Sequence, residues 1–112
     1  MELVMLMEDA DAAVCPYYVV EFGVAAIGMT LRHTTTSTGE CRVLVGELRC
    51  DSVGRPMTAL ACGRITVGDL VLAVNDASLV TCSDMEAVGD VFRRARRPAR
   101  VLFQKAHTIS DF

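Results

Sequence analysis

Short segments with the character of β-strands, each bounded by glycine or polar turn residues, constrain the fold of this chain most. Runs rich in β-branched and aromatic residues, or alternating between apolar and polar residues, are typical of strands. Apolar runs such as 70–74 are far shorter than the roughly 18 residues that cross a bilayer, so we expect no transmembrane helix. The predicted strands cover residues 17–22, 28–34, 41–48, 70–74 and 100–105.

Segment 28–34 has the clearest alternation. One face carries Met29, Leu31 and His33, and the opposite face carries Thr30, Arg32 and Thr34. Because successive side chains of a strand point to opposite faces, this pattern predicts a half-buried strand. The polar run 34–40 that follows indicates a loop before the next strand.

Two helices are predicted among the strands. Ser83 and Glu86 have the spacing of a capping box, which indicates a long helix over about 83–97 that ends before Pro98. A short helix of about two turns is expected over 57–61, with Pro56 in its first turn. At 112 residues, the chain has the length of one domain, and these elements predict a mainly β fold with some α+β character.

Composition narrows the class of partner and the compartment. The chain has 11 Lys and Arg against 14 Asp and Glu, a net charge of −3, which argues against nucleic acid as the partner. Residues 1–15 are acidic and lack a basic flank, so they are interpreted as an N-terminal arm rather than a signal peptide. Five cysteines, an odd number without a CxxC pair, favour reduced thiols and a cytoplasmic location.

The sequence gives no sign of catalysis, of a metal site or of a cofactor. Structural zinc lacks its usual ligand spacing. Two histidines, His33 and His107, are spread among scattered cysteines, and no nucleophile, histidine and acid stand in a recognisable arrangement. We therefore expect a protein that is not an enzyme and that needs no cofactor.

Residues 63–88 carry a resemblance to a known family. The pattern comprises a glycine-hydrophobic corner, a Gly-Asp pair before an apolar strand, an asparagine closing that strand, and small apolar residues inside the second helix. In this chain these are Gly63-Arg64-Ile65, Val67-Gly68-Asp69, Leu72, Val74-Asn75 and Ala87-Val88. The pattern, with the order of elements over about 17–105, resembles a single PDZ domain in the eukaryotic strand order.

The resemblance implies a six-stranded, partly open barrel or sandwich with two helices, formed by residues 16–106 between the arm 1–15 and a tail 107–112. It also implies a protein–protein interaction module that binds short C-terminal peptides by strand addition, as scaffold proteins do. The hydrophobic-Gly-hydrophobic sequence Ile27-Gly28-Met29 is similar to the family's carboxylate-binding loop. Independently of the name, a bend around glycine can present N–H groups to an anion, and a strand edge after it can pair with a peptide.

By the same resemblance, the peptide lies in a groove between the second strand and the second helix. Met29 and Leu31, with Val88 and Val91, are expected to line the pocket for the last peptide side chain. The residues expected along the strand and the groove are Thr30, Leu31, Arg32, His33, Asp84, Val88 and Val91.

The chain departs from the family pattern at two positions. Asp84, predicted as the first residue after the Ser83 cap, stands where many PDZ domains have histidine. A carboxylate only accepts hydrogen bonds, so it favours a hydroxyl or a cation two residues before the peptide's end. Phe22 stands where the family often has a basic residue that supports the carboxylate, and Arg32 and Arg49 are the alternatives that sequence offers.

Two other interpretations stay open. In the first, the chain is a structural or assembly module whose groove is filled by a neighbouring chain. The chain's own end Ser110-Asp111-Phe112 has an apolar last residue and a hydroxyl two residues before it, which such a groove would accept. Alternatively, the arginine-rich segment 93–100 docks on anionic lipid or an acidic partner. Apart from this alternative, a membrane is expected as a partner only indirectly.

Overall fold

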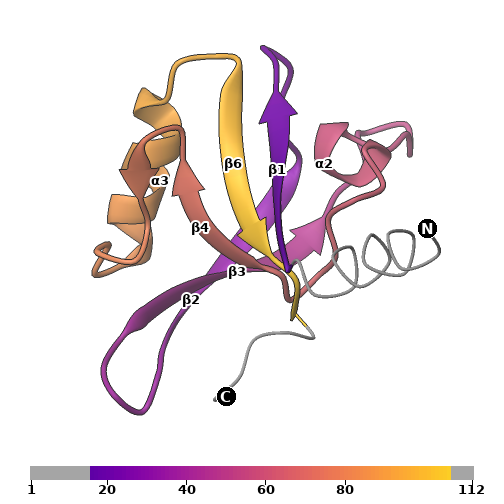
Figure 1. Cartoon of the computed structure of the whole chain (residues 1–112). Coiled ribbons are helices and arrows are strands. Elements are labelled where there is room, and N and C mark those ends of the chain that lie inside the picture. The colour runs from indigo at the N-terminus through magenta and orange to yellow at the C-terminus, as the bar shows by residue number, and fades with distance from the viewer. Residues whose placement is uncertain (1–15, 107–112) are drawn as a thin grey trace, which may run out of the picture.

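In the computed structural model, which describes residues 16–106, six strands form one antiparallel sheet in the order β1-β6-β4-β3-β2, with β5 paired to β4 (Figure 1). The sheet is open rather than closed into a barrel, and the mainly β fold with two helices is confirmed for this part of the chain. The strands are β1 (Tyr17–Phe22), β2 (Met29–Thr35), β3 (Cys41–Leu48), β4 (Leu70–Val74), β5 (Ala77–Ser78) and β6 (Ala99–Gln104).

Strand β2 forms one edge of the sheet. It pairs with β3 alone, from Met29 opposite Leu48 to Thr35 opposite Cys41. The register shifts after Thr30, where Gly46 is the extra residue of a bulge in β3. A Cβ atom at Gly46 would come within 3.1 Å of the Thr30 hydroxyl oxygen, so the small residue allows the two strands to approach. Strand β2 itself stays regular, and within residues 16–106 no strand pairs with its other backbone edge.

The long helix α3 (Met85–Arg94) is shorter than expected. Its N-cap is Asp84, whose Oδ1 accepts from the Ala87 N–H at 2.9 Å, so the prediction of Ser83 as cap was wrong by one residue. Aspartate caps as well as serine, and the extended backbone of Asp84 delays the helix start. The helix ends because Ala95 is already extended, before the stop expected at Pro98.

Helix α2 (Thr58–Ala61) is a single turn, shorter than the two turns expected. Pro56 does not lie in its first turn, because it forms an isolated bridge with Cys50 and the Met57 N–H still donates to the Arg49 carbonyl. The two helices lie toward opposite ends of the sheet in Figure 1. In the described part of the chain, neither is long and apolar enough to cross a membrane.

Asn75 joins the end of β4 to the start of β6. Its φ of 53° lies in the left-handed region that asparagine tolerates in turns, and it opens the turn into β5, a strand that the sequence analysis missed. Its N–H donates to the Arg100 carbonyl at 2.7 Å, and its Oδ1 accepts from the Arg100 N–H at 2.9 Å. Asn75 therefore fixes where the chain enters β6 after helix α3.

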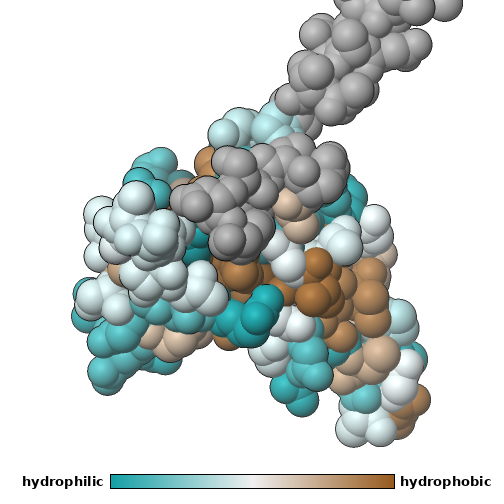
Figure 2. Space-filling model, turned by 90° about the horizontal axis from the view of Figure 1, so that it is seen from below, coloured by the Kyte–Doolittle hydropathy of each residue, from teal (hydrophilic) through white to brown (hydrophobic). Residues whose placement is uncertain are grey.

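The core consists of aliphatic residues around two phenylalanines. Phe22 and Phe103 are fully buried, together with Val43, Val45, Val71, Val74, Leu79, Val88 and Val101. Tyr18 stacks on Phe103 with ring centroids 5.0 Å apart. Other apolar residues remain exposed. Figure 2 shows hydrophobic residues from the middle to the right side of one face, next to hydrophilic residues on the left.

A buried carboxylate joins both ends of the domain to its centre. Asp69, 1% exposed, precedes β4, and its Oδ2 accepts from the Tyr18 hydroxyl and from the Thr66 N–H at 3.0 Å. Its Oδ1 accepts from the Ala106 N–H at 2.9 Å, and Lys105 Nζ lies 3.5 Å from Oδ2. Burial and the hydrogen bond to Asp69 raise the pKa of Tyr18 far above its usual value, so this hydroxyl stays a donor. Strand β1, the segment before β4 and the segment after β6 thus all donate to the carboxylate of Asp69.

We expect Asp69→Ala to lower the free energy of unfolding by about 3–5 kcal/mol, because it leaves the half-buried Tyr18 hydroxyl and the N–H groups of Thr66 and Ala106 without their acceptor. Glu47→Ala is the control, since Glu47 is exposed and has no ion pair among the described residues. Urea unfolding of both variants measures the difference. Losses of equal size would contradict the structural importance of Asp69.

Candidate functional site

A groove lies between the unpaired edge of β2 and helix α3. It forms a cavity of about 310 Å³ and is almost wholly apolar. Its lining residues are Ile27, Met29 and Leu31 on the strand side and Met85, Val88, Gly89 and Phe92 on the helix side. Of the residues predicted from the sequence, the structure brings Ile27, Met29, Leu31 and Val88 together here.

The helix side of the groove lacks one residue that was predicted to line it and includes three that were not predicted. Met85, Val88, Gly89 and Phe92 follow the i, i+3, i+4, i+7 spacing of one helical face. Val91 lies off that face and packs, half-buried, against the core, so it does not line the groove. The helical spacing of these residues is visible in the sequence. The predicted lining residues were assigned with Ser83 as the cap, one residue before the actual cap Asp84.

Gly89 contributes to the groove by having no side chain. A Cβ atom there would meet only the flexible end of Arg93, with Nη1 at 3.0 Å. Glycine inside a helix costs about 1 kcal/mol relative to alanine. The open space beside Val88 therefore exists at the expense of helix stability.

The loop between β1 and β2 is held by its carbonyl groups. The Ile27 carbonyl accepts from the Ala59 N–H of α2 at 2.8 Å, and the Gly28 carbonyl accepts from the Arg49 N–H at 2.9 Å. In a trans peptide unit the N–H points opposite to the C=O. The N–H groups of Gly28 and Met29 therefore point away from α2 and β3, toward the open edge at the groove. The Gly28 N–H has no hydrogen-bond partner within residues 16–106.

Gly28 is required at this position for two reasons. Its φ of +78° lies in the left-handed region that favours glycine. In addition, a Cβ atom would overlap the Met57 Cβ and lie 3.0 Å from its Sδ. The glycine predicted as the centre of an anion-binding bend thus also permits close contact between this loop and the segment before α2.

His33 marks the far end of the groove. Its Nε2 lies 3.1 Å from the Cys82 carbonyl, and a carbonyl only accepts, so Nε2 carries the hydrogen. The bond ties β2 to the segment that precedes α3. His33 thus helps to hold the two walls of the groove together. Arg32 points to the opposite face of the strand and lines a separate hollow with Thr34. Thr30 is half-buried beside Gly46.

Asp84 is exposed at the start of α3 and does not line the groove. One carboxylate oxygen is used to cap the helix. The other oxygen has no hydrogen bond within the described residues. A role of Asp84 in selecting the peptide residue two before the end stays a prediction, and it rests on that second oxygen.

A basic residue reaches the loop from a place that sequence spacing does not indicate. Phe22, which occupies the expected basic position, is fully buried in the core. Arg97, beyond the end of α3, donates through Nη1 to the Gly23 carbonyl at 2.6 Å and to the Ala25 carbonyl at 3.2 Å. The contact joins residues 74 and 72 positions apart, so no local pattern could have found it.

Two other arginines of segment 93–100 lie beside carboxylates. Arg93 pairs with Asp90 on the same helix, and Arg100 Nε lies 3.9 Å from Glu21 on β1. Exposed pairs of this kind contribute little to stability. The segment expected as a basic patch is therefore partly divided between local partners.

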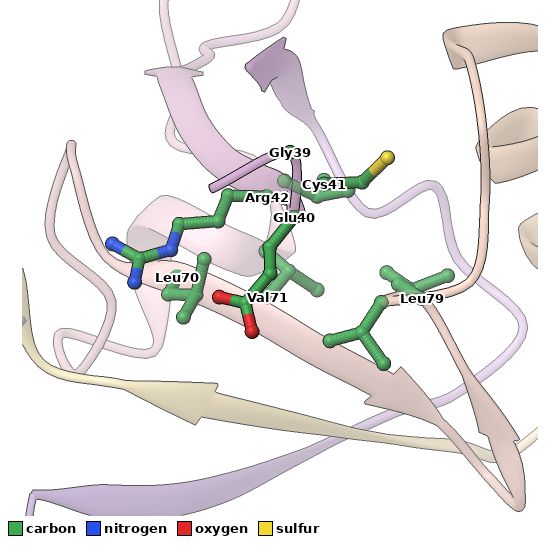
Figure 3. A pocket seen from close by; sticks show the side chains of 9 residues that line it. Gly39, Glu40, Cys41, Arg42, Leu70, Val71 and Leu79 are labelled. Carbon is green, nitrogen blue, oxygen red and sulfur yellow. The ribbon is translucent and has the colours of Figure 1, made fainter. Parts of the chain in front are cut away.

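A hollow of about 450 Å³, larger than the groove, lies beside the first residues of β3 and of β4 (Figure 3). Apolar Val43, Leu70, Val71 and Leu79 line it together with Glu40, and Figure 3 shows the Glu40 and Arg42 side chains projecting over β4. The lining mixes charged groups of both signs and borders a strand that is already paired on both sides. It lacks the unpaired strand edge and the outward N–H groups of the groove beside β2.

Nucleophilic and metal-binding groups do not converge in the described part of the chain. No group of three or more His, Cys, Asp or Glu side chains is placed to hold a metal ion there. Cys82 is buried, and burial raises the pKa of its thiol, which disfavours the reactive thiolate. The arm 1–15 and the tail with Ser110, Asp111 and Phe112 lie outside the described residues.

We expect Gly28→Ala to destabilise the fold by more than the about 1–2 kcal/mol that a left-handed backbone costs other residues, because it adds the overlap with Met57. Gly54→Ala is the matched control, since Gly54 has a φ of +88° with no atom within 4 Å of an added Cβ. Urea unfolding gives both values. A loss at Gly28 no greater than that at Gly54 would show that the contact with Met57 has no cost.

Neither the models of protein families nor the curated proteins compared with the chain gave a match. A function for this protein therefore has to be argued from the residues and geometry of the groove and its loop.

Proposed function

We propose that this chain is a PDZ-like module that binds the C-terminal end of another protein as an added strand between β2 and α3. The terminal carboxylate is held by the loop Ile27-Gly28-Met29, and the last side chain enters the apolar groove. The function is recognition, without covalent chemistry.

The observation that carries the proposal is the direction of the loop's peptide groups. The Ile27 and Gly28 carbonyls are both turned inward to fixed donors, so the N–H groups of Gly28 and Met29 face outward side by side. Successive N–H groups at a bend form an anion-binding concavity. An anion bound there would sit at the end of the groove where β2 begins.

The unpaired edge of β2 supports an extended ligand. Strand β2 ends the sheet, and residues at alternate positions of an antiparallel strand direct both N–H and C=O to the same side. From Met29, whose N–H faces outward, this edge continues at Leu31 and reaches His33. Five strand residues at about 3.3 Å each span roughly 16 Å, enough for a peptide of four to five residues.

The composition of the groove supports an apolar last residue. Met29, Leu31, Val88 and Phe92 offer no charged group to a ligand side chain. The negative charge of the carboxylate is instead stabilised by backbone N–H dipoles of the loop at one end of the groove. This separation of a polar end from an apolar pocket favours a free C-terminus over an internal segment of a chain.

The competing interpretation, a groove filled by a neighbouring copy, uses the same strand edge. A free peptide would then compete with the neighbouring chain and shift the protein toward the monomer. Sedimentation with and without saturating peptide therefore separates a module that assembles through the groove from one that remains a monomer throughout.

We expect the peptide selected most strongly from a C-terminal library to bind at least tenfold more weakly when its end is amidated, since the amide loses the charge that the outward N–H groups hold. Titration calorimetry measures both affinities, and amide chemical shifts should move most at Gly28 and Met29. Equal affinities of acid and amide, or a library without any binder, would overturn the proposal.

We expect substitutions at Gly89 to close the groove without harming the fold. Both Gly89→Ala and Gly89→Leu should raise the free energy of unfolding by about 0.5–1 kcal/mol, because both residues form helix better than glycine. Peptide affinity should fall modestly with alanine and strongly with leucine. Unchanged affinity in a well-folded Gly89→Leu variant would place the binding site elsewhere.

A further inference from the structure

Arg97 contacts the part of the loop that precedes the N–H groups of Gly28 and Met29. Its Nη1 donates to two carbonyls of the loop, those of Gly23 and Ala25. With the bonds from Ala59 and Arg49, four carbonyls between Gly23 and Gly28 accept from the body of the domain. Only Arg97 holds the first half of this loop among the described residues.

The sheet places Arg97 beside the loop. Phe22 at the end of β1 pairs with Ala99 at the start of β6, so the chain just before β6 runs next to the chain just after β1. The Arg96 carbonyl is held by Asn75 Nδ2 at 3.3 Å. The backbone from which the Arg97 side chain extends is therefore anchored on both sides, and the guanidinium needs to span only the short gap to the loop.

The charged group of Arg97 faces neutral acceptors in the part of the chain that the structure describes. Among the described residues it makes no ion pair, unlike Arg93 and Arg100, and its two acceptors are neutral carbonyls. It also follows the C-terminal end of α3, where the helix dipole is negative and would repel an anion. A cation at that place offsets the dipole at the end of the groove where a carboxylate would lie.

Resting on the proposed function, we infer that Arg97 is the positioning residue of the carboxylate loop. It fixes residues 23–26 through their carbonyls and adds the positive charge that Phe22 does not supply. The ligand group that it favours is the terminal carboxylate of the bound peptide. Arginine suits this role because its planar, permanently charged group donates to two acceptors at once.

The test compares Arg97→Ala with Arg96→Ala, which removes the same charge from the neighbouring position; the Arg96 side chain makes no hydrogen bond or ion pair with the loop among the described residues. Two readouts are needed, both on the full chain. Amide hydrogen exchange of residues 23–28 reports the loop without any ligand. Calorimetry with the selected peptide, as acid and as amide, reports recognition of the carboxylate.

We expect Arg97→Ala to speed exchange in residues 23–28 and to weaken binding of the acid peptide about tenfold while changing that of the amide little. Arg96→Ala should alter both readouts less than twofold, and Arg97→Lys should restore part of the acid preference but less of the protection. Equal effects of the two alanine variants, or loss of acid and amide binding alike, would overturn the inference.

The two proposals fail in different ways. A wild-type chain that binds no peptide overturns the proposed function, whereas the exchange readout still decides whether Arg97 holds the loop. Unaltered exchange in Arg97→Ala overturns the positioning role even where the wild type binds the acid peptide strongly.

Discussion

The carboxylate of Asp69 is the interaction on which the rest of the domain depends. It accepts hydrogen bonds from Tyr18 near the start of the described chain, from Thr66 before β4 and from Ala106 at its end, with Lys105 close by. A buried charge is tolerated only when its acceptor sites are filled. The donors that fill them come from three distant segments, which ties β1 and the end of β6 to the approach to β4, while β2 lies at the edge of the sheet opposite β1.

The position of β6 then decides the surroundings of the loop after β1. Because Phe22 pairs with Ala99, the residues that follow one strand and precede the other are neighbours, and Arg97 meets the Gly23 carbonyl. Helix α3 occupies the connection between β5 and β6, so its end lies at the same place. The contact between Arg97 and the loop is thus a consequence of the pairing of β1 with β6.

The backbone of the loop between β1 and β2 forms the proposed carboxylate site without any side chain of its own. Carbonyls turned inward satisfy donors of α2 and of the residue after β3, and planarity of the peptide unit then turns the N–H groups of Gly28 and Met29 outward. Glycine at position 28 allows both the left-handed backbone and the contact with Met57. The same residue therefore serves stability and the proposed recognition, which is why its substitution alone cannot separate the two.

The sequence by itself determined the elements whose cause is local. Alternation set the faces of β2, the apolar run set β4, and Gly28 marked the bend before the edge strand. Ser83 and Asp84 are both good caps, so the choice between them, and with it the replacement of Val91 by Phe92 in the groove, depended on backbone conformation. The contacts of Asp69 and Arg97 join residues many positions apart, and only the tertiary structure decided them, because register and pairing, rather than local preference, bring such groups within hydrogen-bond distance.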